Sequence, residues 1–196
     1  MARLGAELRR QDFVEATVKV VAEHGVAKAT TRRIAAAAGS PLASLHYLFH
    51  TKEDLFYAVF ELLYSVPQQA LEHSPASATL ADSATGILRH LINWFIAHPE
   101  VAAAQPELFN WALRNDPELA NKVYVQAIDG IESIFRELPE DQLDDHLVMA
   151  VSRLLVQLVD GLVVAWCVHR DNDRLQAETE YACQALSLLA SPRTTS

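Results

Sequence analysis

The segment Ala29–Leu55, which reads ATTRRIAAAAGSPLASLHYLFHTKEDL, decides the fold of the N-terminal part of this chain. Thr30 is a favourable N-cap for a short helix that ends at Gly39. The pair Ser40–Pro41 then turns the chain, and a second short helix is expected over Leu42–Phe49. Two short helices joined by a tight turn that contains glycine form a helix-turn-helix, the arrangement that places its second helix in the major groove of DNA.

The second of these helices has two different faces. Leu45 and Phe49 are four residues apart and share one face, which we expect to pack toward Ile34 and Ala38. The side chains that then face outward or half outward are Leu42, Ala43, Ser44, His46 and Tyr47. These outward side chains are the ones that would meet a DNA groove.

Helical spacing continues on both sides of this segment. A helix over about residues 8–24 is expected before it, and Thr51 caps a long helix that begins at Lys52. Further helices are expected over about residues 81–97, 101–113, 118–138, 142–168 and 174–189, punctuated by Pro67, His73–Pro75, Pro99, Pro106, Pro117 and Pro139. No alternating strand pattern competes with them, so the chain is predicted to be all-α.

The net charge of −9 is unevenly distributed along the chain. Residues 1–54 contain eight Lys and Arg against six Asp and Glu, a net charge of +2. Residues 55–196 contain eight against nineteen, a net charge of −11. Only the surface that meets phosphates must be positive, so an isoelectric point of about 5.3 does not exclude nucleic-acid binding.

Membrane insertion and secretion are disfavoured by the sequence. The longest apolar run, Leu154–Val168, is interrupted by Gln157, Asp160 and Gly161, and is shorter than the roughly 18 residues that a membrane span needs. The basic first ten residues lack the apolar core of a signal peptide. Because Cys167 and Cys183 are expected to be buried thiols in a reducing compartment, we expect a cytoplasmic protein with no membrane partner.

Catalytic and metal motifs are weak. His46 and His50 have a metal-compatible spacing, but no third ligand accompanies them. The group Asp144–His146 lies at a predicted helix start, where acidic side chains favour the helix dipole. No glycine-rich phosphate loop, nucleophile elbow or Cys–His arrangement is present. The sequence therefore predicts no catalytic residue, no metal and no cofactor.

Three pieces of the N-terminal region resemble the TetR family of bacterial transcriptional regulators. They are Ala29–Gly39, Leu45–Phe49 and Thr51–Leu55, and they follow one another within a resemblance that covers about residues 10–60. The resemblance implies a three-helix helix-turn-helix domain over residues 1–54 and a helical effector-binding and dimerisation domain over residues 55–196. It also implies a repressor that an unknown small-molecule effector releases from double-stranded operator DNA.

The resemblance further implies DNA-binding roles for six residues. Thr31 and Arg32 match positions that contact phosphate and reach a base, and a guanidinium such as that of Arg32 can donate bidentately to guanine. Lys52 matches a lysine that contacts phosphate, at a helix N-terminus that itself attracts anions. The remaining three positions, on the recognition helix, are Ser44, His46 and Tyr47.

The recognition helix departs from the family at three positions. The family usually has Ser or Thr at Pro41, a small residue such as Gly at Ala43, and Tyr at His46. Base reading is therefore expected to depend on Arg32, Ser44 and Tyr47 or on the shape of the DNA.

A homodimer is expected because a two-fold symmetric operator needs two recognition helices about 34–36 Å apart. The last two predicted helices have apolar stripes broader than one core face requires, and in the family these helices form a four-helix bundle with their mates. The stripes consist of Leu147, Val151, Leu154, Leu155, Leu158, Val159, Leu162 and Trp166, and of Tyr181, Ala185, Leu188 and Leu189. The alternative is that both stripes are buried within one subunit.

The middle of the chain is rich in aromatic rings and scattered polar atoms, as ligand pockets are. The candidate effector contacts are His90, Trp94, Phe109, Trp111 and Tyr124. Aromatic side chains at helical spacing also serve as ordinary core. Two other functions stay open: a DNA-binding regulator with no effector, and an all-helical enzyme that uses His90 or His98 as a base. The enzyme would leave the segment Ala29–Leu55 unexplained.

Overall fold

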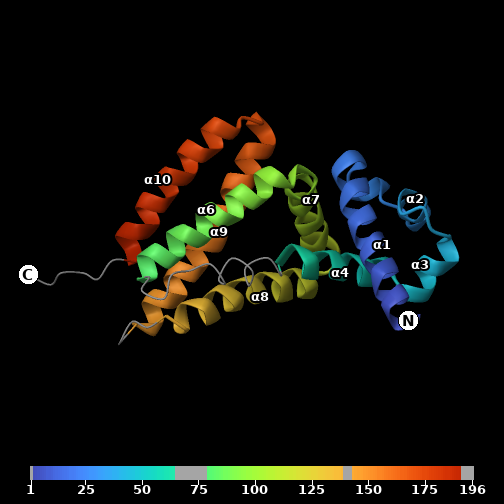
Figure 1. Cartoon of the computed structure of the whole chain (residues 1–196), viewed down its shortest axis with the longest axis horizontal. Coiled ribbons are helices and arrows are strands. Elements are labelled where there is room, and N and C mark those ends of the chain that lie inside the picture. The colour runs from blue at the N-terminus through green and yellow to red at the C-terminus, as the bar shows by residue number, and fades with distance from the viewer. Residues whose placement is uncertain (1, 65–78, 139–142, 191–196) are drawn as a thin grey trace, which may run out of the picture. The chain divides into compact units, whose positions relative to one another are not determined.

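The computed structural model describes residues 2–64, 79–138 and 143–190, and all the regular elements in these ranges are helices, with no strand (Figure 1). The predicted all-α fold is confirmed. The chain divides into two compact units. Unit 1 consists of residues 1–64 and 99–123, and unit 2 consists of residues 65–98 and 124–196.

Unit 1 contains the helices α1 (Ala2–His24), α2 (Thr31–Ala37), α3 (Leu42–Leu48), α4 (Lys52–Tyr64) and α7 (Pro99–Asn115), with a 3₁₀ turn η1 (Val26–Lys28) between α1 and α2. The first residues of α8 (Pro117–Arg136) complete it. Its core is apolar and includes Phe13, Ile34, Leu45, Phe56 and Leu108, all fully buried. Helix α7 thus supplies core side chains to the same unit as α2 and α3, although it lies far along the chain.

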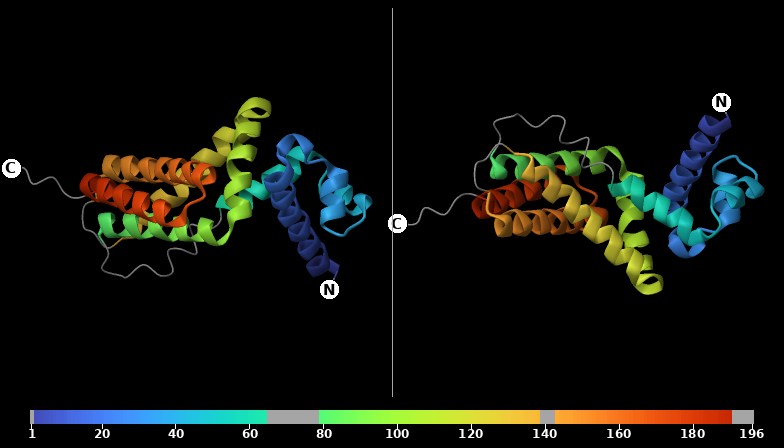
Figure 2. Two further views of the ribbon diagram at one scale, coloured as in Figure 1. Left: turned by 90° about the horizontal axis from the view of Figure 1, so that it is seen from above. Right: turned by 90° about the horizontal axis from the view of Figure 1, so that it is seen from below.

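Unit 2 contains α6 (Leu80–Ala97), the rest of α8, α9 (Asp145–His169) and α10 (Asn172–Ala190). Helices α6, α9 and α10 run side by side, as both views in Figure 2 show. Leu88, Leu155 and Leu186, one from each of these helices, are fully buried. The three helices therefore bury their apolar faces against one another.

Local signals set the helix ends in unit 1. The hydroxyl of Thr30 accepts a hydrogen bond from Arg33 N at 3.3 Å, which caps α2 as predicted. Thr51 and Asp54 form a reciprocal capping pair before α4, with backbone-to-side-chain distances of 2.9 and 3.0 Å. Gly39 has a φ of 60°, which permits the left-handed turn between α2 and α3 that a side chain would strain.

One of the predicted boundaries needs correction. Helix α1 begins at Ala2 rather than near residue 8, so the basic N-terminal residues lie on a helix. Pro106 lies inside α7, as it does in the helix expected over about residues 101–113. The cost of a proline inside a helix, of the order of 3 kcal/mol, is offset because α7 buries Ala102, Ala104 and Leu108 around it. The predictions at Pro67, His73–Pro75 and Pro139 lie outside the described residues.

The predicted division into functional domains between residues 54 and 55 falls in the first turn of α4, which belongs to unit 1 as a whole. The functional division stays a prediction. In length and composition α9 passes as a membrane span, with a mean hydropathy of 2.0. The core helix of a soluble protein passes the same test, and α9 buries Val151, Leu155 and Val163 among its neighbours.

Candidate functional site

The two faces of α3 separate as the spacing predicts. Leu45 is 1% exposed and Phe49 packs edge-on against Phe13, with the ring centroids 6.5 Å apart. On the other face, Tyr47 is 81% exposed and His46 is also exposed. Ser44 is half-buried beside them. The helix therefore holds its outward side chains on a rigid apolar base.

Helix α2 adds two further predicted DNA-binding residues to unit 1. Arg32 is exposed and Thr31 is half-buried in the first turn of the helix. The neighbouring Arg33 differs, because its guanidinium donates to Lys28 O at 3.1 Å. Arg32 is thus left to solvent while Arg33 holds the loop before α2.

Lys52, the sixth predicted DNA-binding residue, is half-buried at the start of α4. Its ammonium Nζ donates to Val26 O at 3.4 Å and lies 4.8 Å from the centre of the Phe56 ring. Burial lowers the pKa of Lys52 below its ordinary value, and the nearby Glu53 carboxylate opposes that shift. In the protein without DNA, this ammonium is therefore engaged within unit 1.

Two contacts join the surroundings of Lys52 to α7. The Phe56 ring meets Trp111 edge-on, with the centroids 4.7 Å apart and the planes at 89°. The carboxylate of Glu107 accepts a hydrogen bond from Val26 N at 3.3 Å. The backbone N–H of Val26 thus donates to a side chain of α7, and the backbone carbonyl of Val26 accepts from Lys52. The contacts form a closed path from α7 through η1 and α4 back to α7.

The predicted effector residues divide between the two units. Phe109 and Trp111 belong to unit 1, where both are half-buried and packed against the core. His90, Trp94 and Tyr124 belong to unit 2. His90 is exposed, whereas Trp94 and Tyr124 are half-buried.

Trp94 lies in a small aromatic group at the end of α6. Its ring stacks on His98, with the centroids 4.4 Å apart and the planes at 26°. The neighbouring Phe95 is buried and meets Trp94 edge-on at 5.1 Å. His98 Nδ1 lies 2.8 Å from Trp94 O and is thereby occupied by its own helix. This contact fixes the orientation of the His98 ring against its own helix.

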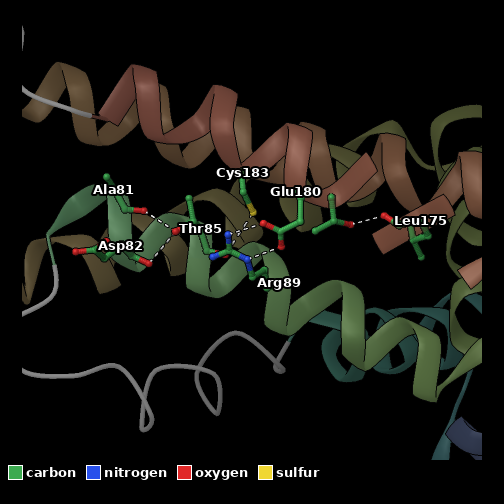
Figure 3. Close-up of polar contacts among 8 residues, drawn as sticks. Ala81, Asp82, Thr85, Arg89, Leu175, Glu180 and Cys183 are labelled. Carbon is green, nitrogen blue, oxygen red and sulfur yellow. Dashed lines mark hydrogen bonds and ion pairs between the residues drawn. The ribbon is translucent and has the colours of Figure 1, made fainter. Parts of the chain in front are cut away.

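Helices α6 and α10 are joined by a bidentate ion pair in unit 2. Arg89 donates to both carboxylate oxygens of Glu180, at 2.7 and 2.8 Å, as Figure 3 shows. These hydrogen bonds raise the pKa of Arg89 and lower the pKa of Glu180. Deeper between the helices, the buried Cys183 thiol donates to Thr85 O at 3.7 Å. A cleft of about 320 Å³ beside the pair is lined by Arg89, Ile92, Asn93, Gln176, Ala177, Thr179 and Glu180.

The apolar stripes of α9 and α10 are only partly covered. Val151, Leu155, Val159 and Trp166 are buried within unit 2, while Leu147, Leu154, Leu158 and Leu162 are half-buried. On α10, the large apolar side chains Tyr181, Leu188 and Leu189 are exposed, as are Val164 and Val168 on α9. The two valines were not among the predicted stripe residues.

The sequence also did not point to Glu107 or Phe56. The contact between Glu107 and Val26 joins residues 81 positions apart, and nothing in either local pattern signals it. Phe56 is an apolar residue in the first turns of a long helix, a pattern that is typical of ordinary core. In the described residues, no group of three or more His, Cys, Asp and Glu side chains is placed to hold a metal ion.

Comparisons with known proteins agree with this geometry. The family model described as bacterial regulatory proteins, tetR family, matches residues 13–59, which include α2, α3 and most of α4. The nicotine-responsive transcriptional repressor HdnoR of Paenarthrobacter nicotinovorans is 27% identical over 166 residues, covering 81% of this chain and 84% of that protein. The transcriptional repressor Rv1474c of Mycobacterium tuberculosis is 25% identical, covering 86% of this chain and 88% of that protein.

Solved structures are similar over nearly the whole chain. A TetR-family member from Streptomyces coelicolor is 25% identical with a TM-score of 0.73, covering 94% of this chain and 99% of that one. The multidrug binding protein EbrR in complex with imidazole is 25% identical with a TM-score of 0.69, covering 95% of this chain and 97% of that one. The matched motif, the similar relatives and the exposed polar face of α3 lead to one conclusion: the chain is a DNA-binding transcriptional regulator that carries the tetR-family motif over residues 13–59 and is similar to TetR-type regulators over most of its length.

Proposed function

We propose that the protein is a homodimeric repressor that binds a two-fold symmetric operator and leaves it when a small molecule binds. The observation that carries the proposal is the face of α3 opposite Leu45, where Tyr47 and His46 extend into solvent from a buried apolar base. A helix with this division fits the major groove, which is about 12 Å wide. Arg32 would read a base, and Thr31, Ser44 and Lys52 would contact the DNA backbone or base edges beside it.

The homodimer would form through α9 and α10. Val168 and Leu188 are each 82% exposed and Tyr181 is 70% exposed, on the two helices whose other faces form the core of unit 2. Exposed apolar surface of this kind gains about 25 cal/mol per Å² when it is removed from water. A second copy of the same face is complementary to it under two-fold symmetry, and it would place two α3 helices on one operator.

The proposed effector is an aromatic, nitrogen-containing small molecule. The similar repressor HdnoR is nicotine-responsive, and EbrR has been solved with imidazole and with ethidium. Each unit by itself offers aromatic surface to such a molecule. Unit 1 has the half-buried Phe109 and Trp111, and unit 2 has the half-buried Trp94 and Tyr124 and the exposed His90. The net charge of −11 over residues 55–196 favours a cationic one.

Release from DNA would proceed through the contacts of Lys52. An effector that moves Trp111 changes its edge-on contact with Phe56, the ring on which the Lys52 ammonium lies. The ammonium has two alternative partners: the Val26 carbonyl with the Phe56 ring, or a DNA phosphate. An effector that binds more tightly to the first arrangement weakens operator binding by the same factor.

The test is operator mapping in the DNA that flanks the gene, followed by titration with ethidium and nicotine as probes. We expect protection of a two-fold symmetric site and a loss of operator affinity of about tenfold or more with an effective probe, which corresponds to about 1.4 kcal/mol of coupling. The protein has three tryptophans, so quenching that is reduced in Trp94→Phe or Trp111→Phe, but not in Trp166→Phe, would locate the probe. If the protein bound no site in that DNA, the proposed repressor function would be contradicted.

A second candidate is a DNA-binding regulator with no small-molecule effector. The packing of Trp111 against Phe56, and of Trp94 against His98 and Phe95, favours it, because these rings already have protein partners. Specific operator binding that none of the probes changes, with unchanged tryptophan fluorescence, would support this candidate. In either case we propose that the protein acts in the cytoplasm, where its operator lies.

A further inference from the structure

A groove of about 250 Å³ lies between the N-terminal part of α1 and α3, whose neighbouring positions are seen in Figure 1. Six side chains line it: Ala6 and Arg9 from α1, and Ala43, Ser44, Tyr47 and Leu48 from α3. Among these six, Arg9 is the charged side chain, Ser44 and Tyr47 supply hydroxyls, and none is a carboxylate. The groove therefore offers positive charge and hydroxyl groups to an anion.

The neighbouring arginine has a different environment. Arg10 donates to Glu61 at 3.3 Å and lies 5.5 Å from the centre of the Phe49 ring, so its charge is paired within unit 1. Arg9 is exposed, and its Nε donates to Gly5 O at 2.9 Å, one turn earlier in the same helix. That bond uses the Nε–H of Arg9. The two terminal nitrogens carry four further N–H donors.

We propose that this groove holds a phosphodiester group of the operator backbone, with Arg9 as its cationic contact. The inference rests on the proposed function, because it takes α3 as the helix that enters the major groove. Ser44 and Tyr47 are then shared between the groove and the DNA face of α3, so a phosphate that flanks the major groove lies within reach of Arg9. A guanidinium matches the geometry of a phosphate bidentately.

The small side chains of the lining make room for the anion. Ala6 of α1 and Ala43 of α3 both line the groove, and a longer side chain at either position would take up part of its space. Ala43 is one of the positions at which the recognition helix differs from its family. The groove lies partly before residue 13, where the family motif begins, so this contact would be additional to those of the motif.

The experiment compares Arg9→Gln with Lys19→Gln in operator binding, using the full chain over a range of salt concentrations. Lys19 is a matched control, since it is exposed on the same helix and its substitution removes the same charge outside the groove. Each phosphate contact contributes about 0.9 to the slope of log affinity against log salt. We expect Arg9→Gln to lower that slope by about 0.9 and to weaken binding about fivefold at 0.15 M salt.

Two further measurements identify the ligand as phosphate. Arg9→Gln should weaken binding to operator and to random-sequence DNA by the same factor, because the backbone carries no base sequence. Arg9→Lys should retain most of the salt slope, because it keeps the charge. Thermal unfolding of Arg9→Gln should match that of the wild type, since the side chain is exposed.

Three results would overturn the inference: an Arg9→Gln slope equal to that of Lys19→Gln, a loss of affinity confined to operator DNA, or a slope that Arg9→Lys loses completely. If the wild type itself shows no operator binding, the proposed repressor fails instead. The two failures are therefore distinguishable.

Discussion

The outward face of α3 and the outward faces of α9 and α10 are both exposed, yet they differ in chemistry. On α3 the exposed side chains include His46 and Tyr47, which can form hydrogen bonds with water. On α9 and α10 the exposed side chains include Val164, Val168 and Leu188, which are apolar and form no hydrogen bonds with water. The comparison indicates that the α3 face suits a polar, charged partner and that the α9 and α10 faces suit an apolar partner.

The largest effect is expected from substitutions on the apolar faces of α9 and α10. Val168→Glu combined with Leu188→Glu places two charges on the α9 and α10 faces and should prevent dimerisation, because burying unpaired charges is costly. Each monomer would hold a single half-site, so operator affinity should fall about 100-fold or more. Light scattering measures the mass and gel shift measures the affinity.

The matched control for this double variant is Leu113→Glu, which changes a leucine that is 52% exposed on α7, outside α9 and α10. It should stay dimeric. A double variant that keeps the mass of a dimer would show that dimerisation uses another surface.

A smaller effect is expected on the polar side of the comparison. Arg32→Ala should lower operator affinity about 10- to 100-fold, because a bidentate contact with guanine contributes about 1–3 kcal/mol of discrimination. Tyr47→Ala should weaken binding as well. Arg33→Ala serves as the comparison, since its guanidinium already donates to Lys28 O. Equal losses for Arg32→Ala and Arg33→Ala, measured by fluorescence anisotropy, would refute the assignment of Arg32 to base reading.

The contact between Glu107 and Val26 should affect the effector response more than DNA binding. Glu107→Ala removes the acceptor for Val26 N, so we expect the probe concentration for half-release to rise about fivefold while operator affinity changes less than threefold. Glu107→Gln keeps an oxygen acceptor and should behave like the wild type. A wild-type response in Glu107→Ala would exclude this contact from the release mechanism.

The smallest expected effect is a pH dependence in unit 2. Because Arg89 lowers the pKa of Glu180 below its ordinary 4.5, the ion pair stabilises the fold above that pH, and its contribution is lost as the pH falls through the lowered pKa. Glu180→Gln should lower the thermal midpoint by a few degrees at most at pH 7, since both partners are exposed. The difference from the wild type should vanish in strongly acidic solution. A difference that persists there would point to packing rather than charge.

The sequence by itself determined the helical fold and the inner and outer faces of α3. Thr30 and Thr51 act as caps through hydrogen bonds that span three residues, and Leu45 and Phe49 share a face because of helix periodicity. These features depend on neighbours within a few positions, and a local pattern contains all the information that they need.

The tertiary structure alone decided how distant residues meet. Helix α7 continues past Pro106, and its residues Glu107 and Trp111 contact Val26 and Phe56. Arg9 and Tyr47 line the same groove. The tertiary structure also decides that Val164 and Val168 face outward while Val163 is buried. The physical reason is that burial and long-range contacts depend on which helices pack together, whereas a helical pattern specifies only which residues share a face.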